Sequence, residues 1–110
     1  MGVTKTDIYT SDLTELARLA KVLGHPARVA ILDHISKAEG CICGDLVEEI
    51  GLAQATISQH LRELKSIGII KGNIEGTSVC YCINYDVWNS YKDKFDDFFK
   101  LVISRNKSCC

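Results

Sequence analysis

The chain has 110 residues, and its 46% hydrophobic and 25% charged residues are ordinary values for one globular domain. A net charge of −1 excludes a chain that is basic throughout, but it allows a locally basic face on an acidic body. No apolar run reaches the ~18 residues of a membrane helix, and the first ten residues carry no apolar secretion signal. We therefore expect a cytoplasmic protein whose six cysteines serve metal, metalloid or redox chemistry.

Two helices are predicted near the start of the chain. Ser11 and the acidic residues after it begin the first helix, in which apolar residues recur at helical spacing up to Gly24. Pro26 suits the first position of the second helix, because the N–H that it lacks would have no partner there. The second helix has a broad apolar surface and ends at Gly40, so we expect it to lie at the centre of the fold.

A short third helix is expected over residues 41–50, and a fourth begins near Gln54 after the glycine-containing turn 51–53. His60 falls at the edge of the apolar stripe of the fourth helix, and we expect a hydrogen-bonded structural histidine there. That stripe is one buried face at helical spacing, made of Ile57, Leu61, Leu64 and Ile67.

Two strands within 69–74 and 79–85 follow, and Gly76 in the short polar connection between them is typical of a hairpin. A long helix over about 86–104 then carries one aromatic and apolar face, and a flexible tail is expected over 105–110. The fold class is therefore mainly α: a single domain of four helices, a β-hairpin wing and a C-terminal helix. The apolar face of that last helix consists of Trp88, Tyr91, Phe95, Phe98 and Val102.

The third and fourth helices with their tight turn form a helix-turn-helix over about 42–67, and the wing over about 69–85 lies behind it. The outer face of the fourth helix suits base recognition, because Gln pairs with adenine, Arg pairs with guanine, and small side chains permit close approach. Flanking lysines can reach phosphates. The candidate DNA-binding residues are Gln54, Ala55, Thr56, Ser58, Gln59, Arg62, Lys65 and Lys71.

Local charge supports this interpretation, because residues 54–73 carry a net charge of +2 on a chain of net −1. The main alternative is a solvated helix face in a helical bundle without a DNA role. A thiol enzyme or a metal carrier has less support, because the sequence contains no C-x-x-C motif and none of the three histidines has a recognisable catalytic partner.

Cys41-Ile42-Cys43 begins the third predicted helix and is the strongest candidate metal site. Residues two apart on a regular helix point away from each other, so binding one ion requires extended or first-turn backbone. Gly44 makes local unwinding cheaper. Soft thiolates favour thiophilic ions, of which trivalent arsenic takes three sulfur ligands.

Two further cysteine pairs are present. Cys109-Cys110 can fold back on the third helix and supply a further ligand; the alternative is a terminus without function. Cys80 and Cys82 share one face of the second wing strand with Cα atoms ~6.6 Å apart, which is an awkward span for a disulfide or for one ion. We expect Cys80 and Cys82 to be small packing residues.

The segments HPARVAILDHI and CICGDLVEEIGLAQATISQHLRELKSIGIIKG, followed by a hairpin and a last helix, resemble the ArsR/SmtB family of winged-helix metal-responsive repressors. The resemblance covers about residues 11–100, and ATISQHLRELKSIGII is its most specific part. Ala53 departs from the usual serine or threonine cap, which is worth ~1 kcal/mol. The resemblance implies a cytoplasmic homodimer that binds double-stranded operator DNA without inducer and releases it with inducer.

In this family the first and last helices, here about 11–23 and 86–104, form the dimer. The resemblance therefore implies an interface made of Leu13, Leu16, Ala20, Trp88, Tyr91, Phe95, Phe98 and Val102.

Family members that respond to arsenite, or to cadmium and lead, carry a Cys-x-Cys that Cys41 and Cys43 match. The third cysteine of the arsenical type is missing at 46–48, no cysteine precedes Cys41 as in the cadmium type, and the last helix lacks the histidines of the zinc type. The resemblance favours As(III) or a related ion as inducer, with Cys41, Cys43, Cys109 and Cys110 as candidate ligands. A cadmium or lead sensor and a thiol redox or persulfide sensor are the alternatives. We expect the bound ion to distort the third helix and so misalign the recognition helix.

Overall fold

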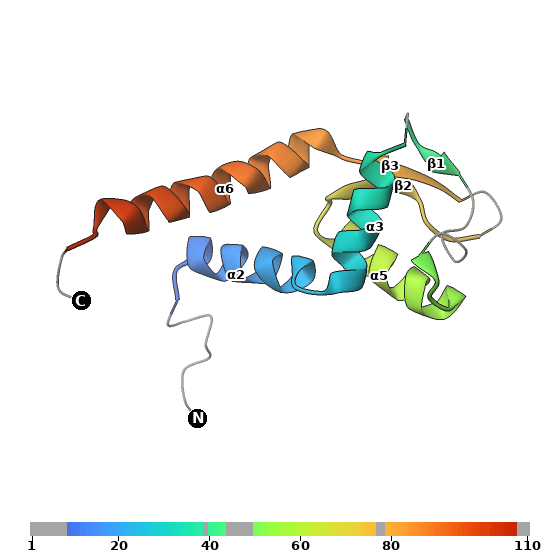
Figure 1. Ribbon diagram of the computed structural model, residues 1–110, viewed down its shortest axis with the longest axis horizontal. Coiled ribbons are helices and arrows are strands. Elements are labelled where there is room, and N and C mark those ends of the chain that lie inside the picture. The colour runs from blue at the N-terminus through green and yellow to red at the C-terminus, as the bar shows by residue number, and fades with distance from the viewer. Residues whose placement is uncertain (1–8, 39, 44–49, 77–78, 108–110) are drawn as a thin grey trace, which may run out of the picture.

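The computed structural model describes residues 9–38, 40–43, 50–76 and 79–107, and it shows the predicted mainly α architecture. Its helices in these ranges are α2 (Ser11–Leu23), α3 (Pro26–Ser36), α5 (Gln54–Ser66) and α6 (Tyr85–Ser104), and its strands are β1 (Ile42–Cys43), β2 (Ile70–Asn73) and β3 (Cys80–Ile83). Helix α5 and the sheet lie at one end of the molecule, whereas α2 and α6, with opposite chain directions, extend over the other end (Figure 1).

Local hydrogen bonds explain where the helices begin. The Thr10 hydroxyl caps α2 by accepting from the backbone N–H of Leu13 at 3.2 Å, so the cap lies one residue before the predicted start. Asn84 caps α6 by accepting from the N–H of Val87 at 3.4 Å. Ala53 precedes α5 without a side-chain cap, as the sequence predicts.

The hydrophobic core joins α2, α3, α5 and the sheet. Helix α3 contributes three buried residues and is central, as predicted, and the apolar stripe of α5 is buried over its whole length. The core residues are Leu19, Val22, Ile31, Leu32, Ile35, Ile57, Leu61, Leu64, Ile67, Ile69, Ile70, Tyr81 and Ile83.

Strands β2 and β3 form the predicted wing, but a third strand joins them. The sheet order is β1-β3-β2, and β1 pairs antiparallel with β3 through Ile42↔Tyr81 and Cys43↔Cys80. The predicted helix over 41–50 is therefore wrong at its start, and residues 44–49 lie outside the described part. Ile42 is half-buried against the core between two exposed cysteines, an alternation that fits a strand better than a helix.

The wing also needs a glycine at one position. Gly72 in β2 has φ +112°, and a Cβ atom there would lie 2.3 Å from the carbonyl oxygen of Cys80. No other residue type allows the two strands to approach this closely without distortion.

The predicted apolar face of α6 divides into two parts. Trp88, Tyr91 and Phe95 pack against the core of their own chain, and the Tyr91 hydroxyl donates to the carbonyl of Ile67 at the end of α5. Beyond Phe95 the apolar side chains are exposed, with Val102 at 51%. Within the described ranges, no helix has the length and apolar character needed to cross a bilayer.

His60 is the structural histidine that the sequence predicts. It is 6% exposed, and its Nδ1 accepts from Arg28 Nε at 3.1 Å. The ring of His25 lies with its centroid 4.5 Å away. Burial, and then the nearby His25 and Arg28, lower the pKa of His60 below its ordinary value of 6.5.

This environment predicts a pH-dependent stability. As pH falls from above 6.5 through the lowered pKa of folded His60, the unfolded chain takes up a proton first, so stability is lost. His60→Gln should therefore lose less stability than wild type between pH 7.5 and 5.5, as measured by urea unfolding at both values. Equal losses in the two proteins would contradict this role for His60.

Candidate DNA interface and thiol cluster

Helix α5 presents the predicted recognition face to solvent. Gln54, Ala55, Thr56, Gln59 and Arg62 are exposed, and Ser58 is half-buried. The side-chain amide of Gln54 donates to Ser58 Oγ at 3.4 Å, so this part of the face is ordered along the helix. Most of these side chains are thus open to solvent in the first two turns, where recognition helices contact base edges.

An ion pair joins the recognition helix to the wing. Arg62 Nε donates to Glu75 Oε1 at 2.6 Å, and Arg62 also donates to Gln59 Oε1 at 3.5 Å. Glu75 was not predicted as a functional residue, although it is the acidic residue of the hairpin connection. The two side chains are 52% and 62% exposed, so the pair contributes little stability and a phosphate can replace the carboxylate at small cost.

The two candidate phosphate-binding lysines differ in their surroundings. Lys65 Nζ donates to the carbonyl of Gly72 in β2 at 2.6 Å, which makes a second link between α5 and the wing. Lys71 is exposed on β2 and lies opposite Cys82 in the register with β3. Recognition helix and wing are therefore connected by two side chains of α5.

The candidate metal-binding cysteines lie on extended backbone. Cys41 is exposed and directly precedes β1, and Cys43 ends that strand. Residues two apart on a strand point to the same side of the sheet, so both sulfurs are on one face. The prediction that a helix at Cys41–Cys43 opposes ligation is therefore wrong, whereas the predicted distortion of the third helix concerns residues 44–49, outside the described part.

The wing cysteines are the partners of this pair and not packing residues, which corrects the sequence prediction. Cys43 and Cys80 form a disulfide with Cα atoms 4.1 Å apart. Cys82 shares a side-chain hydrogen bond with Cys41; this bond and burial raise the pKa of the Cys82 thiol, against the opposing effect of Lys71. The spacing of Cys80 and Cys82 in the sequence gives only their separation along one strand, whereas the contacts of both residues cross to another strand.

The cysteines of β1 and β3, together with Cys41 directly before β1, therefore lie on one face of the sheet. In the disulfide-bonded state, no three His, Cys, Asp or Glu side chains of the described residues are grouped as metal ligands. With Cys43 and Cys80 joined, Cys41 and Cys82 carry the thiols of this face. Cys109 and Cys110 lie outside the described residues, and 105–107, the described part of the expected tail, are exposed.

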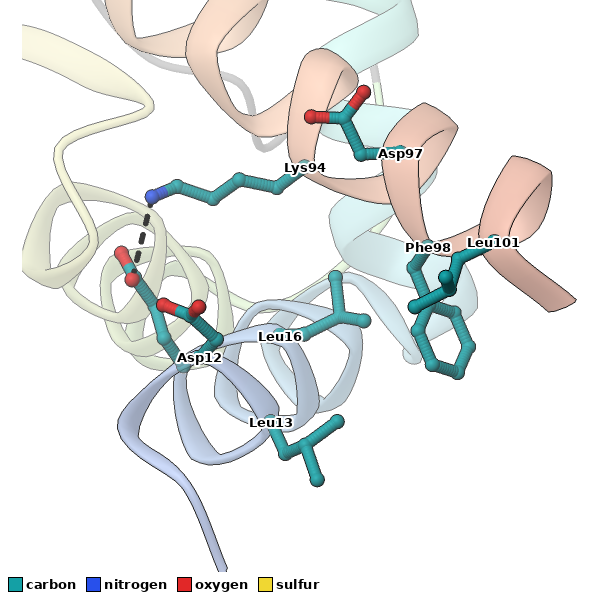
Figure 2. A pocket seen from close by; sticks show the side chains of 8 residues that line it. Asp12, Leu13, Leu16, Lys94, Asp97, Phe98 and Leu101 are labelled. Carbon is teal, nitrogen blue, oxygen red and sulfur yellow. Dashed lines mark hydrogen bonds and ion pairs between the residues drawn. The ribbon is translucent and has the colours of Figure 1, made fainter.

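A groove between α2 and α6 lies at the end of the molecule opposite the wing. It encloses about 280 Å³, and Figure 2 shows Leu13 and Leu16 of α2 beside Phe98 and Leu101 of α6. Lys94 on α6 pairs with Glu15 on α2 at 3.3 Å, marked by the dashed line. Of the predicted interface residues, Leu13, Ala20, Phe98 and Val102 are exposed and Leu16 is half-buried. Exposed apolar groups thus border this groove.

Comparisons with known proteins agree with this architecture. A family described as a helix-turn-helix domain matches residues 23–73. The arsenical resistance operon repressor of Staphylococcus xylosus is 32% identical over 95 residues, which are 86% of each chain. A cadmium resistance transcriptional regulatory protein CadC homolog of Staphylococcus aureus is 36% identical over 81 residues, covering 73% of this chain and 66% of the relative. The solved structure of a "possible transcriptional regulatory protein" of Mycobacterium bovis aligns with a TM-score of 0.60 at 26% identity, covering 88% of this chain and 98% of that one.

Proposed function

The chain belongs to the ArsR/SmtB family of winged helix-turn-helix transcriptional repressors, and we propose that it is released from its operator by arsenite bound at Cys41 and Cys43. The observation that carries this proposal is the position of Cys43 on, and of Cys41 directly before, a strand that pairs with the wing. An ion bound there acts on the element that is linked to the recognition helix.

DNA binding is assigned to the exposed face of α5 together with the wing. The helix supplies Gln and Arg side chains for base edges, and the cations around it attract the phosphate backbone. Operator contact by Arg62 competes with the carboxylate of Glu75, 2.6 Å from its Nε. The proposal also assigns contacts with bases to five residues of this helix: Gln54, Ala55, Thr56, Ser58 and Gln59.

The thiols favour a soft ion. Arsenite and related ions prefer thiolates, and relatives of this chain are named for arsenical and cadmium resistance. Binding requires reduced cysteines, which fits action in the cytoplasm. The Cys43–Cys80 disulfide favours a second candidate on the same fold, a repressor that senses oxidants through its thiols.

Coupling between ion and DNA follows the order of the sheet. A displacement of β1 relative to β3 is transmitted to β2 through the backbone hydrogen bonds between β3 and β2. Strand β2 is in turn joined to α5 by the hydrogen bond from Lys65 to the carbonyl of Gly72. To change operator occupancy strongly, the ion must bind the released state several kcal/mol more tightly than the DNA-bound state.

We also propose a homodimer formed through α2 and α6. The support is the run of exposed apolar side chains along the C-terminal half of α6, beside the groove shown in Figure 2. These side chains are Phe98 36%, Phe99 58%, Leu101 44%, Val102 51% and Ile103 71% exposed.

Arg62→Ala should weaken binding to a duplex selected by the wild-type protein from a random pool. We expect about tenfold weaker binding at 0.1 M salt, and a slope of log K against log salt that is lower by about 0.9 if Arg62 contacts a phosphate and unchanged if it contacts a base. Fluorescence anisotropy at several salt concentrations measures both quantities. Lys92→Ala, an exposed cation on α6 paired with Asp96, is the control and should bind as wild type. Unchanged affinity of Arg62→Ala would remove this residue from the interface.

Phe98→Asp should weaken dimerisation at least tenfold, because it places a charge in the apolar groove. Sedimentation velocity over a concentration series measures the monomer–dimer equilibrium. Tyr85→Asp is the matched control: Tyr85 is 59% exposed on the same helix, 13 positions and ~20 Å away. A Phe98→Asp protein that remains as dimeric as the control would place the interface elsewhere.

Cys41→Ser and Cys43→Ser should bind DNA within about twofold of wild type, because neither cysteine lies on the recognition face. Arsenite should release the reduced wild-type protein from DNA and fail to release either variant. The measurement is anisotropy during arsenite titration in a thiol buffer. If arsenite still releases both variants, the assignment of the site to Cys41 and Cys43 is wrong. If peroxide but not arsenite releases the wild type, and mass spectrometry then finds Cys43 joined to Cys80, the protein senses oxidants and not arsenite.

A further inference from the structure

We infer that the wing supplies the remaining sulfur ligand of the inducer, so that the ion is held by Cys41 and Cys43, directly before and in β1, and by Cys80 or Cys82 from β3. This inference rests on the proposed function. It assigns Cys80 and Cys82 a binding role, and it predicts that the ligand set is complete without Cys109 and Cys110.

The strand register brings these sulfurs together. Cys43 lies directly opposite Cys80, and Ile42 lies opposite Tyr81, so the next position along the ladder places Cys41 opposite Cys82. Side chains of one strand that are two residues apart share a face, so all four thiols are on the same side of the sheet. The disulfide and the hydrogen bond between Cys41 and Cys82 show that both opposed pairs are in contact.

Distances favour cross-strand ligation over ligation by one strand. Two sulfurs bound to one ion at ~2.3 Å each lie no more than ~4.6 Å apart. Cys41 and Cys43 alone have Cα atoms ~6.6 Å apart along the extended chain. The Cα atoms of Cys43 and Cys80 are only 4.1 Å apart. An ion centred on this face is therefore reached more easily when a sulfur of β3 joins those of β1.

Polar side chains of β2 lie beside the cysteines of β3. The register between β2 and β3 places Lys71 beside Cys82 and Asn73 beside Cys80. The row across the sheet is thus Cys41, Cys82, Lys71, and the next row is Cys43, Cys80, Asn73. A cation and an amide thus border the four sulfurs in these two rows.

Loading requires two balanced steps. A thiol reductant first donates two electrons and two protons to the Cys43–Cys80 disulfide and becomes a disulfide itself. Arsenous acid then exchanges its three hydroxides for three cysteine sulfurs: three As–O and three S–H bonds break, three As–S bonds form, and three water molecules leave. Arsenic stays trivalent throughout.

The test uses the reduced full-length protein and two matched double variants. Cys80→Ser with Cys82→Ser removes the wing thiols, and Cys109→Ser with Cys110→Ser removes the tail thiols. X-ray absorption of the arsenic-loaded proteins counts sulfur neighbours, and anisotropy measures DNA affinity and arsenite release. We expect three sulfurs in wild type and in the tail variant, and two or fewer in the wing variant. The wing variant should bind DNA normally without arsenite and need at least tenfold more arsenite for release.

The outcomes separate this inference from the proposed function. The inference that the wing supplies a ligand is wrong if the wing variant keeps three sulfur neighbours and normal release by arsenite. It is also wrong if the tail variant loses a sulfur neighbour. Neither result contradicts the proposal that the protein senses arsenite. A further outcome is that the arsenic has three sulfur neighbours in wild type and two in the wing variant while arsenite fails to release the wild type from DNA. This result would support the ligand set and overturn the proposed function. Circular dichroism of the wing variant checks that its fold is retained.

Discussion

The pairing of β1 with β3 is the contact on which the arrangement of the molecule's chemistry depends. It is short, with Ile42 and Cys43 opposite Tyr81 and Cys80, yet it brings the segment before the helix-turn-helix onto the wing. Tyr81 is 1% exposed, so β3 is fixed to the core on one face while its cysteines lie on the other. Without this pairing the thiols of the two segments would be separated by the whole helix-turn-helix.

Most of the fold could be predicted from the sequence because its signals are local. The stripe of Ile57, Leu61, Leu64 and Ile67 has helical spacing and is buried, and Pro26 begins a helix as expected. The predicted start of the third helix is wrong because periodicity over the three residues 41–43 cannot distinguish a helical turn from a strand. What decides the conformation of Ile42 is a partner strand 39 positions later, which no local pattern contains.

The candidate site was predicted in part for the same reason. The exposed residues of α5 follow from the helix period, and Cys41 with Cys43 follows from a motif. The sequence predicts Cys80 and Cys82 as packing residues because it shows their mutual spacing but not their distance from other strands. Glu75 was missed because its partner Arg62 is on another element, although the two side chains meet at 2.6 Å.

One hydrogen bond has a consequence for the operator. The Tyr91 hydroxyl donates to the carbonyl of Ile67, the residue that ends the recognition helix, and thereby attaches α6 to that helix within one protomer. In the twofold dimer that we propose through α2 and α6, the separation of the two recognition helices is then set by α6 and not by a flexible linker. Such a dimer reads an inverted repeat whose half-sites recur after about one duplex turn, ~34 Å, and it tolerates little variation in the number of base pairs between them.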